Sequence, residues 1–130
     1  MSLSDLRIRA GLDTADLARR YVAEGVAQTS DFLDATSAEA VGATLEKLPY
    51  VIVAPDETGQ TLVINDEVIR RFGEQQVRTF LQQTLQRAGA GFAFIHQSYA
   101  LQDEYARHPE LPIARVTEFL QSRTFLAVGE

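Results

Sequence analysis

The sequence predicts an α+β fold, in which helices pack on a mainly antiparallel sheet, and three stretches carry this prediction. The β-branched runs Tyr50–Ala54 and Gln60–Asn65 flank Pro55–Gly59, whose composition is typical of a turn, so the three segments predict a β-hairpin. Apolar residues recur at helical spacing over Glu74–Ala88, which predicts an amphipathic helix. Gly89–Leu101 then reads as a strand.

Length, composition and charge limit the classes of protein that fit. At 130 residues, 45% of them hydrophobic, the chain predicts a single domain over residues 1–130, or part of one. It has no cysteine, which excludes disulfides and thiolate chemistry. The net charge of −6 argues against a nucleic-acid partner. No run of about 18 or more apolar residues and no export signal are present, so we expect a cytoplasmic protein without a membrane partner.

The first third of the chain predicts two helices and a short strand. Asp13 or Thr14 is placed to cap a helix from about Thr14 to Glu24, and Gly25 is placed to end it. Val26–Thr29 reads as a short strand. Thr36–Glu39 has the pattern of a capping box, which predicts the start of the second helix at this point.

The rest of the chain adds short helices around the hairpin and the later strand. Asn65 or Asp66 is placed to cap a brief helix that ends at Phe72-Gly73, and one or two helical turns follow Leu101. Pro112 is placed to start a further helix, and Ser122 to cap the last one. In total the sequence predicts four strands: Val26–Thr29, Tyr50–Ala54, Gln60–Asn65 and Phe92–Tyr99.

The strand within Gly89–Leu101 begins apolar and ends polar. Alternation places His96 and Ser98 on one face and Tyr99 on the other. Such a strand either lines a pocket with its polar end or is a core strand that runs out into solvent. The candidate pocket-lining residues are therefore His96, Ser98 and Tyr99.

The residues themselves predict no catalytic, metal-binding or cofactor-binding set. His96 is followed two positions later by Ser98, so it has no H-x-D partner. Ser98 and His96 share a strand face, with no third group to orient the histidine as a base. His108-Pro-Glu110 formally fits H-x-E, but it lies between prolines, and His96 is the only other histidine.

Two sets of motifs together resemble a known family. The first is Gly25-Val-Ala-Gln-Thr-Ser-Asp-Phe-Leu-Asp34, a helix opened by Thr36–Glu39, and Leu48-Pro-Tyr50. The second is Gly91-Phe-Ala-Phe-Ile-His-Gln-Ser-Tyr-Ala-Leu101 followed by Pro112-Ile-Ala-Arg-Val-Thr-Glu-Phe-Leu-Gln-Ser-Arg-Thr-Phe-Leu126. Their order resembles the N-terminal half of the prolyl-hydroxylase-like 2-oxoglutarate/Fe(II)-dependent oxygenases, over most of residues 14–130.

The resemblance implies part of a double-stranded β-helix (jelly-roll) barrel, left incomplete. The family's cofactors are Fe(II) and 2-oxoglutarate. They are held by an H-x-D pair, a distal His and an Arg or Lys, all of which come after the segment that ends here at Leu126. No ligand is carried over to this chain, so no cofactor site is expected in it. We expect it to be inactive alone, as a truncated product, a fragment or a degenerate relative.

Two other classes remain open. Leu48–Asn65 resembles the opening hairpin of PAS domains, which would make the chain a small sensory or protein-interaction module. Alternatively, the chain is a compact α+β protein that self-associates or binds a partner at an exposed sheet edge.

Overall fold

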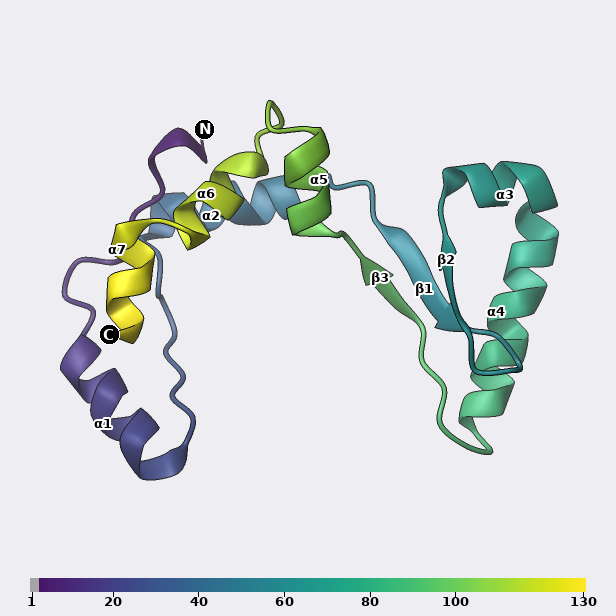
Figure 1. Cartoon of the computed structure of the whole chain (residues 1–130), viewed down its shortest axis with the longest axis horizontal. Helices are drawn as coiled ribbons and strands as arrows, with labels where there is room; N and C mark the ends of the chain where they lie inside the picture. The colour runs from purple at the N-terminus through teal and green to yellow at the C-terminus, as the bar shows by residue number, and fades with distance from the viewer. Residues whose placement is uncertain (1–2) are drawn as a thin grey trace. The chain divides into compact units, whose positions relative to one another are not determined.

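The computed structural model describes residues 3–130, which form two compact units. The sheet unit is Pro49–Ala100, and the terminal unit comprises residues 3–48 together with Leu101–Glu130. Within the described residues there are seven α-helices and one open, three-stranded antiparallel sheet (Figure 1). The α+β prediction is confirmed at this level.

The hairpin of the sheet unit is close to the one that the sequence predicts. Strands β1 (Val51–Pro55) and β2 (Thr61–Ile64) pair antiparallel, with Ile52 opposite Ile64. In the turn, one carboxylate oxygen of Asp56 accepts hydrogen bonds from the backbone N–H groups of Thr58 and Gln60, at 2.8 and 2.9 Å. The β-branched runs therefore form the ladder, and the aspartate shapes the turn.

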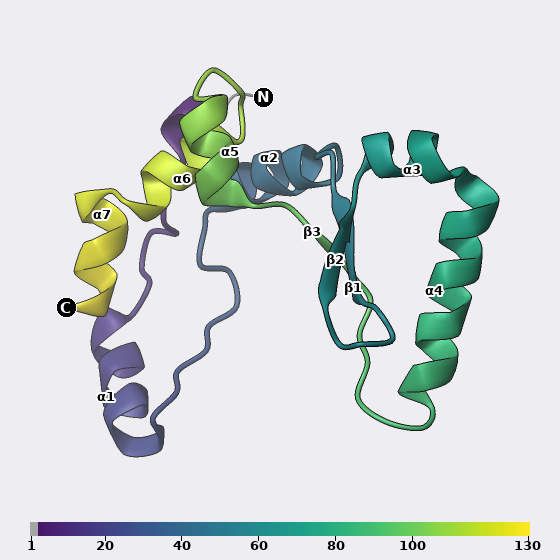
Figure 2. The same ribbon diagram turned by 45° about the vertical axis from the view of Figure 1, so that its right-hand side comes forward.

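Two helices follow β2 and precede the third strand. Helix α3 (Asp66–Phe72) is capped by Asn65, whose side chain accepts from the Val68 N–H at 3.0 Å. Helix α4 (Glu74–Ala88) has the bounds that its apolar spacing predicts. It directly follows α3 (Figure 2) and packs against α3 and β1. The chain then returns along β1 as β3 (His96–Ser98), which gives the strand order β2-β1-β3 (Figure 1).

The core of the sheet unit is small. Ala54 of β1 is fully buried, Ile64 of β2 is buried on the same face of the sheet, and Thr84 of α4 is fully buried. The spacing over Glu74–Ala88 predicts a buried stripe that ends with Thr84, Leu85 and Ala88. This prediction is wrong at Leu85 and Ala88, because Leu85 is 63% exposed and Ala88 is also exposed. Thr84, which belongs to the same predicted stripe, is buried as expected, and its hydroxyl donates to the Phe80 carbonyl at 3.0 Å.

The terminal unit is helical and includes a 3₁₀ turn at each end. Its buried residues come from the first turn, the second helix and the sixth: Leu3, Ser37, Ala40, Ile113, Ala114 and Thr117. Its helices are α1 (Thr14–Glu24), α2 (Ala35–Leu45), α5 (Leu101–Arg107), α6 (Ala114–Leu120) and α7 (Arg123–Leu126).

Helix ends in the terminal unit are fixed by side-chain caps. Of the two predicted caps of α1, the structure uses Asp13. The predicted end of α1 at the left-handed Gly25 and the predicted cap of α7 at Ser122 are confirmed. The capping box at Thr36–Glu39 is wrong, because α2 begins earlier. Its cap is Asp34, which accepts from the Ser37 N–H at 2.7 Å. An aspartate with extended backbone immediately before the helix competes successfully with a threonine inside it.

The strand predicted at Val26–Thr29 is also wrong, since these residues form no strand. The pairing in this region occurs further along, at an isolated antiparallel bridge between Ile8 and Leu33. The backbone there bonds from Arg9 N to the Phe32 carbonyl at 2.9 Å. Composition favours a strand at Val26–Thr29, but a strand also needs a partner, and these residues pair with no strand among residues 3–130.

No helix among residues 3–130 combines the length and the apolar character needed to cross a lipid bilayer.

Candidate functional site

The strand that carries the candidate pocket-lining residues is shorter than Phe92–Tyr99. Only His96–Ser98 belongs to β3, where His96 lies opposite Val53, and Ser98 opposite Val51. The residues before His96 continue outside the ladder. The prediction of a longer strand is wrong, because only His96, Gln97 and Ser98 pair with β1.

His96 and Ser98 lie on the open face of the sheet. They lie opposite Val53 and Val51, whose side chains point to the face of the sheet that does not carry the buried Ala54. His96 and Ser98 therefore point away from the core. Val63, opposite Val53 in the hairpin, shares that face and is 56% exposed.

The side chains at the polar end of β3 do not all share one environment. His96 is exposed and its ring stacks on Phe94, with centroids 5.5 Å apart and planes at 26°. Ser98 is half-buried, and so is Tyr99, which lies just beyond the strand. The arrangement offers a hydroxyl and an imidazole on one face of an open sheet.

The two histidines belong to different units and gather no set of metal ligands. His108 Nδ1 lies 3.3 Å from Glu110 Oε1 in an exposed loop of the terminal unit, so the H-x-E residues contact each other. A facial-triad iron site needs three converging ligands. No group of three or more His, Cys, Asp or Glu side chains within residues 3–130 is placed to hold a metal ion. The described residues therefore do not fit an Fe(II) centre.

A cavity of about 270 Å³ lies in the terminal unit, among the first 3₁₀ turn, α6 and α7. None of His96, Ser98 or Tyr99 lines it. Its charged wall is an ion pair between Arg115 and Glu118 at 2.9 Å, one turn apart on α6. The lining residues are Leu3, Ser4, Asp5, Leu6, Arg115, Glu118, Phe119, Ser122 and Thr124.

The charged groups of this cavity are already engaged. Arg115 Nη2 also donates to the Pro109 carbonyl at 2.8 Å, and Asp5 pairs with Arg7. Within the described residues, Arg115 Nε and Thr117 Oγ1 are buried without a hydrogen-bond partner. Sequence reasoning missed this site; the available signal was the spacing of Arg115 and Glu118, which places them side by side on a helix.

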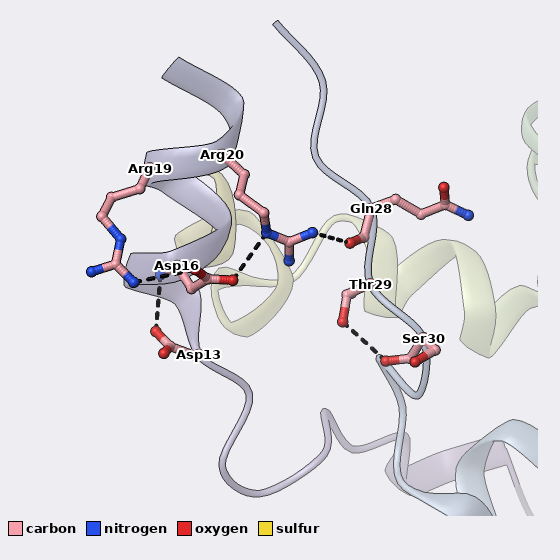
Figure 3. Close-up of polar contacts among 7 residues, drawn as sticks. All are labelled: Asp13, Asp16, Arg19, Arg20, Gln28, Thr29 and Ser30. Carbon is pink, nitrogen blue, oxygen red and sulfur yellow. Dashed lines mark hydrogen bonds and ion pairs between the residues drawn. The ribbon is translucent and has the colours of Figure 1, made fainter. Parts of the chain in front are cut away.

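A second polar cluster joins α1 to the segment that follows it (Figure 3). Arg20 Nε donates to Asp16 Oδ2 at 2.9 Å, and Arg20 Nη1 donates to the Gln28 carbonyl at 2.7 Å. Asp16 also pairs with Arg19 at 3.2 Å. The hydrogen bond from Arg19 is the largest cause that lowers the pKa of Asp16 below its usual range. These contacts hold the extended segment against the helix.

Two other aspartates have lowered pKa values for structural reasons. The backbone N–H of Ser37, at the start of α2, is the main cause that lowers the pKa of Asp34. The hydroxyl of Thr58, which bonds the Asp56 carboxylate at 2.6 Å, is the main cause that lowers the pKa of Asp56. Both carboxylates act as acceptors for a cap or a turn, so neither shift indicates an acid or base catalyst.

Comparison with known proteins adds no relative, because no family model, curated protein or solved structure matches this chain. The assignment of function therefore depends on the sequence motifs and on where the fold brings them. Two of those motifs meet in the terminal unit. The ring of Phe32 stands edge-on to that of Phe125, with centroids 5.8 Å apart, and Phe119 contacts the same ring at 5.6 Å.

Proposed function

We propose that this chain is the N-terminal region of a prolyl-hydroxylase-like 2-oxoglutarate/Fe(II)-dependent dioxygenase. In this role the chain contributes helices and part of a sheet to the enzyme. The iron ligands and the basic residue that binds 2-oxoglutarate would come from residues that follow the α6–α7 segment. The jelly-roll barrel belongs to the same proposal, with β1–β3 as part of it.

The packing of Phe32 against Phe125 carries the proposal. Phe32 belongs to the Asp31-Phe-Leu33 motif, and Phe125 to the motif that runs from Glu118 to Leu126. The two motifs are far apart in the sequence, and each was singled out by resemblance to the same family. Their contact gives both motifs the same structural role, because the aromatic residues of each motif help to bury those of the other.

The order of elements also supports the proposal. Helix α2 is followed by the hairpin β1–β2, then by α4 and β3, and finally by α6 and α7. The family's order is a strand, a helix, a hairpin, a helix, a strand and a last helical segment. The chain follows this order from α2 onward, with the short helices α3 and α5 inserted, but Val26–Thr29 does not form the first strand. Ser122 caps α7 by accepting from the Phe125 N–H at 3.2 Å, which gives the serine of the last motif a structural role.

The reading frame downstream of Glu130 tests this proposal. We expect it to encode an H-x-D pair, a distal histidine and a basic residue in that order. A frame that continues with none of these residues would contradict the proposal. A second result would also contradict it: a stop codon directly after Glu130, together with turnover of 2-oxoglutarate by the 130-residue product.

The alternative is a small PAS-like sensory or protein-interaction module, and one observation favours it. The hairpin β1–β2 forms as the PAS-like motif at Leu48–Asn65 implies, with Gly59 in the left-handed conformation at its turn. Helices α3 and α4 and a single further strand then follow. A PAS fold would show five consecutive antiparallel strands, so an experimental structure with that sheet would reverse the order of the two proposals.

A further inference from the structure

The open sheet has two edges, and they differ in how each is protected from pairing. Strand β1 is central, so β2 and β3 each leave one side without a neighbouring strand among residues 3–130. Edge strands present free N–H and C=O groups to other chains, and proteins protect them with charged residues or proline. Carboxylates flank β2 on both sides: Asp56, Glu57, Asp66 and Glu67.

No such protection is present around β3. Residues 88–102 contain no Asp, Glu, Lys, Arg or Pro, although 23% of the whole chain is charged. His96 and Gln97 of the strand are exposed. Arg87 and Asp103 are the nearest charged residues in the sequence. An extended segment of high β-propensity and low charge is the kind that pairs with another strand.

The segment that leads into β3 extends this edge. Phe92 is 93% exposed, and within the described residues Phe92, Ala93 and Phe94 make no backbone hydrogen bond. The rings of Phe92, Phe94 and His96 follow one another, with successive centroids 6.0 and 5.5 Å apart. The edge thus combines unused backbone groups with a row of aromatic side chains.

We propose that β3 and the preceding residues Phe92–Ile95 pair antiparallel with the same segment of a second copy of this chain. A twofold axis then joins two three-stranded sheets into one of six strands. Charge favours a second copy at this place. A protein of net charge −6 repels itself wherever acidic residues meet, and residues 88–102 form an edge where no like charges come face to face. This pairing does not depend on the proposed function.

Sedimentation of the full chain over a range of about 10 µM to about 1 mM tests the pairing, with two matched lysine variants. We expect the wild-type chain to show a monomer–dimer equilibrium. Phe92→Lys should raise the dissociation constant by about tenfold or more, because a lysine on an edge strand opposes pairing with another strand. Val63→Lys, at the exposed β2 edge, should leave it unchanged. Phe92 and Val63 are both largely exposed, so neither variant disturbs the core.

Amide hydrogen exchange supplies a second readout that does not depend on a variant. Protection of the amides at 92–98 should rise with protein concentration, while that of the β2 amides should stay constant. A chain that remains monomeric up to about 1 mM would overturn the proposal. A dimer weakened by Val63→Lys and not by Phe92→Lys would also overturn it, because the dimer interface would then lie at the β2 edge.

Discussion

The contacts that stabilise the sheet unit differ in kind from those that stabilise the terminal unit. In the sheet unit, backbone hydrogen bonds join β1 to both neighbouring strands, and α4 packs on β1. The stability of this unit therefore depends on a few buried residues that these elements share. In the terminal unit, hydrogen bonds between a side chain and a backbone group join segments that are far apart in the sequence. The Arg7 N–H donates to Ser37 Oγ at 2.9 Å, and Arg9 Nε donates to the Asp31 carbonyl at 2.8 Å. We therefore expect substitutions in the core to destabilise the sheet unit most, and substitutions that remove single polar contacts to destabilise the terminal unit.

The largest effect is expected for Ala54→Asp in the sheet unit. Ala54 is fully buried, so the new carboxylate would lose its hydration without gaining a partner, at a cost of more than about 3 kcal/mol. Urea unfolding followed by amide exchange in β1 measures this loss. Val63→Asp, at a position of the neighbouring strand that is 56% exposed, is the control and should change stability by less than about 1 kcal/mol. Equal effects of the two variants would contradict the assignment of the covered face.

Arg87→Met tests a polar contact that connects α4 to the hairpin. Arg87 Nη2 donates to the Pro55 carbonyl at 2.9 Å and to Thr84 Oγ1 at 3.0 Å. Methionine keeps much of the side-chain volume and removes both bonds, so the free energy of unfolding should fall by about 1–3 kcal/mol. Arg78→Met, on the exposed side of α4, should stay within about 0.5 kcal/mol of wild type. A loss confined to Arg78→Met would sink this account of the contact.

Ser122→Ala probes a cap in the terminal unit. The serine accepts from the Phe125 N–H, and its loss leaves that donor unpaired, at a cost of about 1 kcal/mol. Chemical denaturation monitored through terminal-unit amides measures the change. Thr124→Ala, two residues later and exposed, should alter the midpoint by less than half as much. If the two variants behave alike, the cap does not stabilise α7.

The smallest expected effect is on the acid side of the stability profile. The pKa values of Asp34 and Asp56 are lowered in the folded chain from an ordinary value of 3.8. Their contribution is therefore present above pH 3.8 and disappears as the pH falls through the lower, folded-state pKa. Asp34→Asn should flatten this acid decline for the terminal unit, and Asp56→Asn for the sheet unit. Denaturation midpoints across this pH range check the result; an unchanged decline in both variants would contradict it.

The sequence predicts local features of this fold well and non-local ones poorly. The bounds of α4 follow from its apolar spacing, and the hairpin from two β-branched runs around a turn. Val26–Thr29 has the composition of a strand but lacks a partner, and composition holds no information about what lies alongside. Asp34 and Thr36 are both good caps two residues apart, and only the backbone conformation decides between them.

The candidate site shows the same limit. Alternation places His96 and Ser98 on one face, as the register confirms, but it does not say whether that face is covered. The cavity beside α6 depends on the first residues of the chain meeting residues more than a hundred positions away, which no local pattern encodes. Its ion pair, between Arg115 and Glu118, is the only part with a local sequence signal.

An anaerobic titration with Fe(II) and 2-oxoglutarate tests the proposed function most directly. Two proteins are compared, this chain of 130 residues and the product extended through the downstream reading frame. We expect the visible metal-to-ligand charge-transfer band from the extended product only, because residues 3–130 gather no set of iron ligands. A stoichiometric band from this chain alone would contradict the account, since its residues would then form the metal site that we assign to the segment after it.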